Sequence, residues 1–280
     1  MYFILKKETG EQVPPSEKVR FEKFNTHGEY VKHMQDSVVS PLLTVQGSLL
    51  QATIAADSSR KVRLTASILS KVPKKTSTSP DNFVNSCLHS NFRGNKYTEH
   101  GKLYEPVARA AYQQKTGRVV TLCGAVVSAT HPFLSASPDG LSGHDSILEI
   151  KCPATGNCRK YIRETRDYDV KVIRAEGSGD DNDDEDDNDT YFLAKNGKRG
   201  FYFQVQFTMF CTERTRCFFY VWSLDKDVLF EVDYDQDFTI DHITRFSDFY
   251  FQHYLPRLVN AVHDHTVVLS DEYAALANMK

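Results

Sequence analysis

The segment SILEIKCP, residues 146–153, constrains the fold of this chain most tightly, because apolar and charged side chains alternate along it. Successive side chains of a β-strand point to opposite faces of the sheet. Leu148 and Ile150 would therefore share one face, and Glu149 and Lys151 would share the other. The alternation predicts a strand whose apolar pair packs against the core while its charged pair faces a cleft.

A second carboxylate, Asp139, lies ten residues before Glu149 in the turn-forming sequence SPDG. A neighbouring strand could bring the two carboxylates together, and the main-chain carbonyl of Ile150 would complete an oxygen-rich site suited to Mg²⁺ or Mn²⁺. The ammonium group of Lys151 could then orient water and stabilise charge on a scissile phosphate. The pattern indicates metal-assisted phosphodiester hydrolysis, although E-x-K on a strand is also typical of a solvated, same-side ion pair.

Helical and strand patterns surround this segment. Residues 101–117 have helical spacing, with Glu105 near a proline-marked start, and residues 200–213 are interpreted as a second helix. Residues 58–72 indicate a turn entering a short helix. An antiparallel meander is predicted for residues 119–153, two strands joined at LDKD for 216–235, and a helix for 246–265. This order of helices and strands predicts an α/β (α+β) core.

The net charge of −3 is unevenly distributed along the chain. Residues 180–189 hold eight of the 37 acidic residues, so the remainder carries 34 basic and 29 acidic residues. The stretch 174–190 is predicted to be a solvated, disordered insertion, because it cannot bury apolar surface and repels itself. The mildly basic remainder can hold DNA in a positively charged cleft.

The chain is predicted to be soluble and intracellular, because it has no long apolar stretch and its start lacks the pattern of a secretory signal. Its six cysteines form no CxxC pair and are interpreted as reduced thiols rather than disulfides or zinc ligands. The predicted organisation is an N-terminal region of unclear role (1–58), a catalytic domain (59–265) and a C-terminal tail (266–280).

Four motifs occur in an order that resembles a known family. GKLYEPVARAAY is followed by SPDG, LEIKCP and YFQVQFTMF, and together they resemble the YqaJ-type viral recombinase family, to which phage lambda exonuclease belongs. The resemblance extends from Arg60 to Trp222 and places the chain in the PD-(D/E)XK nuclease superfamily. It implies a restriction-endonuclease-like core with a central mixed β-sheet flanked by helices.

The resemblance also implies roles for five side chains. Asp139 and Glu149 would be direct metal ligands, and Glu105 would support the metal site from its helix. Lys151 would be the catalytic lysine. Gln204 matches the active-site glutamine that contacts the nucleophilic water or the lysine; a helix-surface amide is the alternative interpretation.

The segment RKVRLTAS resembles the part of the family in which an arginine and a hydroxyl grip a 5′ phosphate. This implies Arg60 and Ser67 as phosphate ligands, with Arg63 and Thr65 as secondary candidates. The guanidinium fork of arginine suits a phosphate. A plain basic helix start with a capping serine is the alternative.

Three further basic side chains flank the motifs: Arg93, Arg159 and Lys160. In a nuclease they would neutralise phosphates without reading sequence. In any other protein they would be ordinary surface residues.

The residues predict a Mg²⁺-dependent deoxyribonuclease, with Mn²⁺ as the alternative ion, and the resemblance implies that it degrades linear duplex DNA 5′ to 3′ in recombination or end processing. The alternatives are an endonuclease or alkaline nuclease of the same fold and a catalytically silent DNA-binding protein. The resemblance implies double-stranded DNA ends, a single-strand annealing protein and further copies of the chain in a ring-shaped trimer as partners. The predicted location is the nucleus or cytoplasm, including that of a virus-infected cell.

Overall fold

The computed structural model describes residues 54–90, 94–173 and 189–271. Arg93, most of the predicted N-terminal region, most of the acidic insertion and residues 272–280 of the predicted tail lie outside the described residues.

The main sheet has five strands in the order β10, β9, β6, β5, β2. Their bounds are Asp227–Asp233, Arg216–Trp222, Ser146–Lys151, Gly140–Ser142 and Val120–Thr121. The central strand β6 runs parallel to β9 and antiparallel to β5, and the outer pairs are antiparallel. The sheet is therefore mixed, as predicted.

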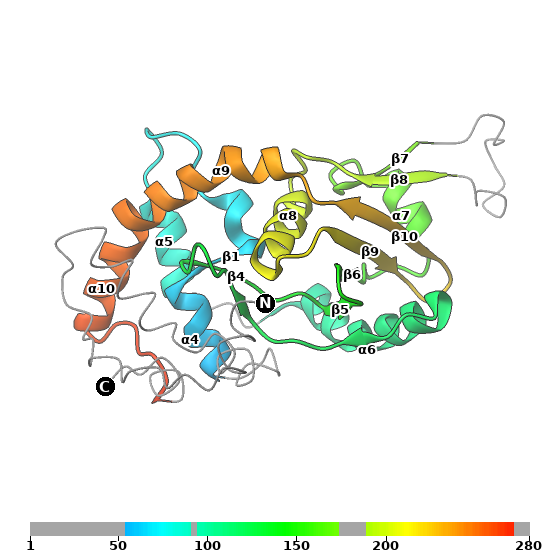
Figure 1. Ribbon diagram of the computed structural model, residues 1–280, viewed down its shortest axis with the longest axis horizontal. Helices are drawn as coiled ribbons and strands as arrows, with labels where there is room; N and C mark the ends of the chain where they lie inside the picture. Colours follow the sequence, from blue (N-terminus) through cyan, green and yellow to red (C-terminus); the bar gives the residue numbers. More distant parts are fainter. Residues whose placement is uncertain (1–53, 91–93, 174–188, 272–280) are drawn as a thin grey trace.

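Two helices cover the faces of this sheet (Figure 1), α6 (Lys96–Thr116) on one side and α8 (Phe201–Thr212) on the other. Leu148 and Ile150 of β6 pack in the cluster that contains Ala108 and Tyr112 of α6. Ile147, on the alternate face, packs in the cluster that α8 joins. Glu149 and Lys151 share the face of Ile147, so the alternation of β6 directs both charged side chains toward the α8 side.

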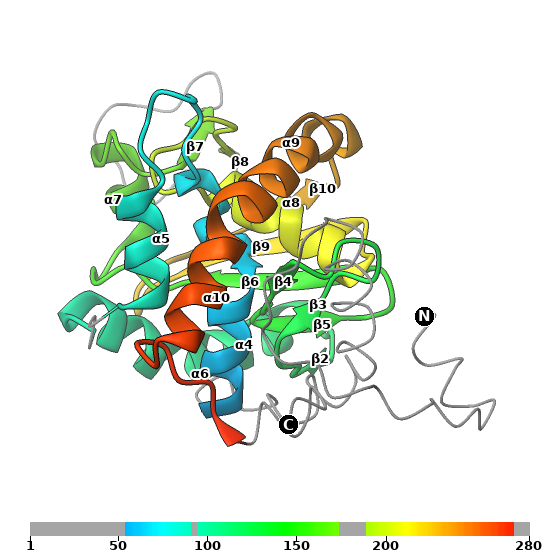
Figure 2. The same cartoon turned by 90° about the vertical axis from the view of Figure 1, so that its left-hand side faces the viewer.

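A three-stranded sheet and a group of helices form the rest of the core (Figure 2). The strands are β1 (Leu64–Thr65), β4 (Leu134–Ala136) and β3 (Val126–Val127), with β4 in the middle. The helices are α4 (Ile54–Val62), the 3₁₀ helix η1 (Ala66–Lys71), α5 (Asp81–Leu88), α9 (Gln236–Phe249), the π-helical turn η2 (Tyr250–Tyr254) and α10 (Leu255–His263). Their buried side chains form one large cluster.

Helix α8 connects the main sheet with the group of helices around the smaller sheet, because both of its faces are buried. Val205 and Met209 pack against the main sheet, whereas Phe203 and Phe207 belong to the large helical cluster. An apolar helix of this kind is expected in a core rather than on a surface. Its position between the two clusters places Gln204 beside β6.

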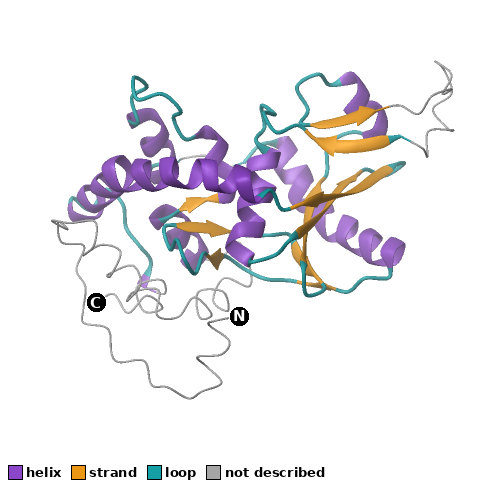
Figure 3. Cartoon of the chain, turned by 45° about the horizontal axis from the view of Figure 1, so that its top comes forward, coloured by secondary structure: helices purple, strands orange, loops and turns teal. Residues whose placement is uncertain are grey.

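A smaller hairpin lies next to the main sheet (Figure 3). It consists of β7 (Val170–Ile173) and β8 (Thr190–Leu193), and α7 (Cys158–Glu164) packs beside it. The predicted acidic insertion begins after β7.

Helix α6 begins earlier than predicted, so Glu105 lies within it rather than near its start. The Asn95 side chain accepts hydrogen bonds from the backbone of Tyr97 and Thr98, and Thr98 completes a capping box. This cap supplies the start that Pro106 was predicted to mark. Pro106 lies inside the helix.

Two other local predictions were wrong in detail. Residues 58–72 hold the end of α4, the short strand β1 and the helix η1, rather than a turn and one helix. Residues 119–129 do not form one strand of a meander, because β2 joins the main sheet and β3 joins the smaller one. The α/β class and the helices flanking a mixed sheet are confirmed.

The first residues of the predicted C-terminal tail pack on the fold. Val267 is buried, and the backbone N–H of Ser270 donates to Ser58 Oγ over 2.9 Å. The six cysteines form no disulfide among themselves. Within the described ranges, we find no helix of the length and apolar character needed to cross a membrane.

Replacing Phe207 tests the joining role of α8. The side chain is fully buried, so Phe207→Ala is expected to lower the free energy of unfolding by about 3–5 kcal/mol in urea denaturation. Leu224→Ala is the matched control, because Leu224 is largely exposed, and its change is expected to stay within about 0.5 kcal/mol. Equal losses in the two variants would contradict the placement of α8 in the core.

Candidate active site

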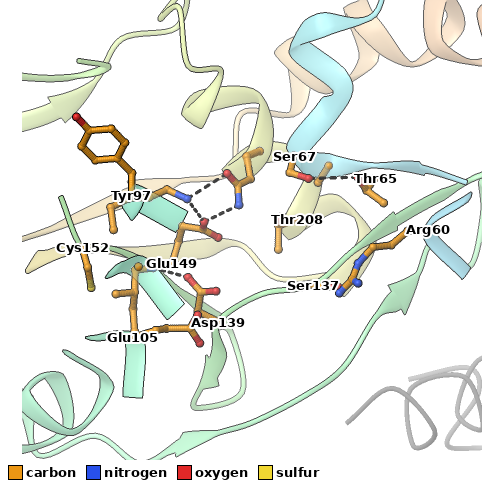
Figure 4. Close-up of a pocket in the computed structure, with 15 residues that line it drawn as sticks. Arg60, Thr65, Ser67, Tyr97, Glu105, Ser137, Asp139, Glu149, Cys152 and Thr208 are labelled. Atoms are coloured by element: carbon orange, nitrogen blue, oxygen red, sulfur yellow. Dashed lines mark hydrogen bonds and ion pairs between the residues drawn. The ribbon is translucent and has the colours of Figure 1, made fainter. Parts of the chain in front are cut away.

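A pocket of about 410 Å³ opens where the end of β6 meets α6, α8 and the segment from α4 to η1 (Figure 4). Its lining residues come from parts of the chain far apart in sequence. Pockets of this size are large enough for a small ligand or one unit of a polymer. Nine of the residues predicted for the site line this pocket, and Ile150 is one of them.

Three side chains form a hydrogen-bonded triangle at the end of β6. Lys151 Nζ donates to Glu149 Oε1 over 2.6 Å and to Gln204 Oε1 over 3.2 Å. Gln204 Nε2 in turn donates to Glu149 Oε1 over 2.5 Å. Glu149 is 1% exposed, so this ion pair is not the solvated surface pair that E-x-K motifs usually form. The amide of Gln204 holds both charged groups in one geometry.

The start of α8, which places Gln204, is anchored by a buried aspartate. Asp169 accepts hydrogen bonds from the backbone N–H groups of Arg199 and Phe201 over 2.9 and 3.0 Å. A carboxylate at a helix N-terminus satisfies otherwise unpaired donors and complements the helix dipole. The Phe201 ring lies 4.8 Å from Lys151 Nζ, so the first residue of α8 also contacts the catalytic candidate.

Asp139 reaches the same place from the turn before β5. Its Oδ2 accepts the backbone N–H of Ile150 over 2.7 Å, which holds the carboxylate against β6. The next residue has to be glycine, because a Cβ on Gly140 would come within 2.2 Å of Val120 Cγ1. The SPDG sequence is therefore suited both to the turn and to close strand packing.

Burial and neighbouring charge perturb two of these groups. Burial, and then the negative charge of Glu149, raise the pKa of Asp139 well above its usual value. For Lys151, burial disfavours the ammonium form, but the carboxylates of Glu149 and Asp139 outweigh burial and raise its pKa. The lysine is therefore charged at neutral pH, beside two buried carboxyl groups.

Glu105 lines the pocket from α6 and forms an ion pair with Arg109, one helical turn later. Arg109 Nε also donates to the main-chain oxygen of Asp139 over 3.1 Å. Arg109 thus ties the helix carrying Glu105 to the turn carrying Asp139. Arg109 was not among the residues predicted for the site, although its four-residue spacing from Glu105 on a helix was a signal for the pair.

The other end of the pocket carries the residues predicted to grip a 5′ phosphate. Arg60, Thr65 and Ser67 all line it, together with Ser137 (Figure 4). The hydroxyls of Thr65 and Ser67 lie 3.2 Å apart. A guanidinium and adjacent hydroxyl groups form a suitable donor set for a phosphate.

Three predicted DNA contacts among the described residues lie elsewhere. Arg63 is 3% exposed and donates to the main-chain oxygen of Pro132 and to Ser59 Oγ, so its guanidinium turns into the core. Arg159 and Lys160 lie on α7 and do not line the pocket. Arg93 falls outside the described residues.

Several lining residues had no individual signal in the sequence. They include Thr208 on α8 and Cys152 after β6. Tyr97 and Gly101 also line the pocket from α6, at four-residue steps before Glu105. That spacing would have identified Gly101 if the early start of α6 had been predicted.

The site offers oxygen ligands to a cation, but not a complete set of side chains. Among the described residues, no three His, Cys, Asp or Glu side chains gather closely enough to hold a metal ion alone. Glu149 Oε2 is nevertheless buried and has no hydrogen-bond partner within the described ranges. Mg²⁺ commonly uses one or two protein carboxylates and takes its other ligands from water and phosphate. Glu149, Asp139 and the Ile150 carbonyl fit that manner of binding.

Removing one carboxylate charge is expected to stabilise the fold. Asp139→Asn keeps an acceptor for the Ile150 N–H but removes a buried charge next to Glu149. In EDTA at pH 8, thermal or urea unfolding is expected to show a gain of about 1–2 kcal/mol.

Asp145→Asn is the matched control for this stability prediction. Asp145 is exposed, and a hydrogen bond from Ser146 lowers the pKa of its carboxyl. Its replacement should leave stability unchanged or reduce it. A clear loss of stability in Asp139→Asn would contradict the charge crowding inferred around Glu149.

Comparison with solved structures shows the same fold in other proteins. The alkaline exonuclease LHK-Exo from Laribacter hongkongensis is 23% identical, with a TM-score of 0.53, over 75% of this chain and 95% of that one. Its complex with dAMP gives the same values. A phage-related exonuclease from Haemophilus somnus 129PT is 13% identical, with a TM-score of 0.43, over 73% of this chain and 96% of that one. No curated protein matches this sequence.

The family comparison agrees with the motifs. Residues 51–215 match the model of the YqaJ-like viral recombinase domain, which is more than half of the chain and includes every catalytic candidate described above. The resemblance inferred from the order of the motifs is therefore confirmed, and the chain belongs to the YqaJ-like viral recombinase family.

Proposed function

We propose that this protein is a divalent-metal-dependent exonuclease that degrades linear duplex DNA from 5′-phosphorylated ends. Its family and its fold suggest a nuclease acting on DNA. The observation that carries the proposal is the convergence of Asp139, Glu149, Lys151 and Gln204 in a pocket that also holds Arg60 and Ser67.

The triangle at the end of β6 supports a role for Lys151 in phosphodiester hydrolysis. Its ammonium is fixed by Glu149 and Gln204, so it can orient a water molecule and stabilise negative charge on the scissile phosphate without reorganising. Gln204 is the positioning residue, because its amide bonds to both partners. Asp169 acts one step further away by anchoring the start of α8.

The carboxylates support the metal part of the proposal. Glu149 Oε2, the Asp139 carboxylate and the Ile150 carbonyl would hold a divalent cation, and Glu105 would assist from α6. When bound, such a cation would neutralise phosphate charge and lower the pKa of a bound water. Mg²⁺ is the expected ion and Mn²⁺ the alternative, because both prefer oxygen ligands.

Two implications of the resemblance stay predictions. They are assembly into a ring-shaped trimer and cooperation with a single-strand annealing protein. Light scattering of the purified protein would measure the first, independently of its activity.

The test uses labelled linear duplexes with a 5′ phosphate or a 5′ hydroxyl, beside a closed circular DNA, in Mg²⁺, Mn²⁺ or EDTA. The expected result is metal-dependent loss of the 5′-phosphorylated strand alone. Cutting of the circle would indicate an endonuclease instead. Absence of cleavage in every metal would favour a DNA-binding protein without catalysis.

Replacing the lysine separates catalysis from folding. Lys151→Gln retains a hydrogen-bond donor for Glu149 but loses the charge, and is expected to lower the single-turnover rate by about 100-fold or more. Asp139→Asn, which is expected to fold more stably, should lose a similar amount of activity. Lys198→Ala is the control, because Lys198 is exposed at the surface. Wild-type activity in Lys151→Gln would exclude a catalytic role for the ammonium.

Arg60 is expected to determine the preference for phosphorylated ends. In Arg60→Ala, the ratio of degradation rates for 5′-phosphate and 5′-hydroxyl duplexes should fall by about 10- to 100-fold, the value of hydrogen bonds to a charged group. Arg166→Ala removes an exposed arginine that does not line the pocket and should leave the ratio unchanged. An unaltered ratio in Arg60→Ala would contradict a role for Arg60 in binding the 5′ phosphate.

A further inference from the structure

One face of α6 forms a wall of the pocket. Tyr97, Gly101 and Glu105 all line it and follow one another at four-residue spacing, so they lie along one side of the helix. Tyr97 and Arg60 are at opposite ends of the pocket, with Glu149 between them (Figure 4). A chain held at the Arg60 end would therefore pass the carboxylates and leave along α6.

Gly101 is unexpected in the interior of a 21-residue helix, where glycine is the least favourable residue after proline. Its backbone is helical, so no left-handed conformation requires glycine there. A Cβ at this position would meet no heavy atom of the described residues within 4 Å, other than its own helix turn. Neither backbone conformation nor packing within the described protein accounts for glycine here, and the open space lies at the pocket.

Tyr97 provides a second, independent observation. It lines the pocket, yet it is 61% exposed, so it contributes little to the core. Lys96 Nζ lies 5.0 Å from the centre of its ring. An exposed aromatic ring beside a cation is suited to stacking on a nucleobase whose phosphates lie nearby.

We infer that the strand to be cut crosses α6 at Gly101 and stacks a base on Tyr97. Gly101 then determines which substrate fits the pocket, because the absence of a side chain lets the sugar-phosphate backbone of DNA lie close to the helix. This inference rests on the proposed function, since it takes DNA as the occupant of the pocket.

DNA binding tests the inference independently of DNA cleavage. The probe is a fluorescently labelled duplex with a 5′ phosphate, titrated in EDTA and followed by anisotropy. Gly101→Val is expected to weaken binding by about 10- to 100-fold, because the added side chain would overpack the contact with the sugar-phosphate backbone. The matched control is Ala110→Val, because Ala110 is exposed and lies about two and a half turns along α6 from Gly101, on the opposite face of the helix. This control should bind as the wild type does.

Thermal stability distinguishes a role of Gly101 in DNA binding from a purely structural role. Gly101→Ala improves helix propensity without a clash, so its melting temperature should rise by about 2–4 °C, while its affinity for the probe falls. A lower melting temperature would overturn the inference, because it would show that packing within the protein itself requires glycine at position 101.

Tyr97 completes the test. Tyr97→Ala should weaken binding by about tenfold and Tyr97→Phe should restore it, because stacking needs only the ring. Wild-type affinity in Gly101→Val, or a wild type that does not bind the probe, would overturn the inference. Absence of cleavage by a wild type that binds the probe would instead count against the proposed nuclease activity alone.

Discussion

The ammonium of Lys151, held between Glu149 and Gln204, is the interaction on which the rest of the site depends. The three side chains come from two elements, the central strand β6 and the buried helix α8. The contact forms only because α8 packs tightly against the sheet through Val205 and Met209 on one face and against the helical half through Phe207 on the other. The burial of α8 therefore holds the geometry of the candidate site in place.

The same arrangement has an energetic cost. Asp139, Glu149 and Glu105 crowd one pocket, where Lys151 pairs with Glu149 and Arg109 pairs with Glu105. Taking charges from water is unfavourable unless each is compensated, and burial together with the charge of Glu149 raises the pKa of Asp139. Active sites commonly retain such destabilising groups because the chemistry requires them. The fold tolerates the cost because its cores on both sides of α8 are extensive.

Much of the fold could be predicted from local patterns. Alternation identified β6, and the apolar run identified α8, because strand and helix periodicities are visible over a few residues. The start of α6 was missed because its cap, Asn95, precedes the apolar pattern by several residues, and Pro106 favoured a later boundary. The two short strands in residues 119–129 were assigned to one sheet because sequence does not show which strands pair.

The sequence by itself determined the residue types of the site and the order of its motifs, because those follow from spacing along the chain. Only the tertiary structure decided which side chains meet. Gln204 reaches Lys151 across 53 residues, Arg109 grips the turn of Asp139 across 30, and the predicted phosphate ligand Arg63 turns inward to Pro132. Such contacts depend on how buried helices pack against the sheet, and packing satisfies the whole core at once rather than any one segment.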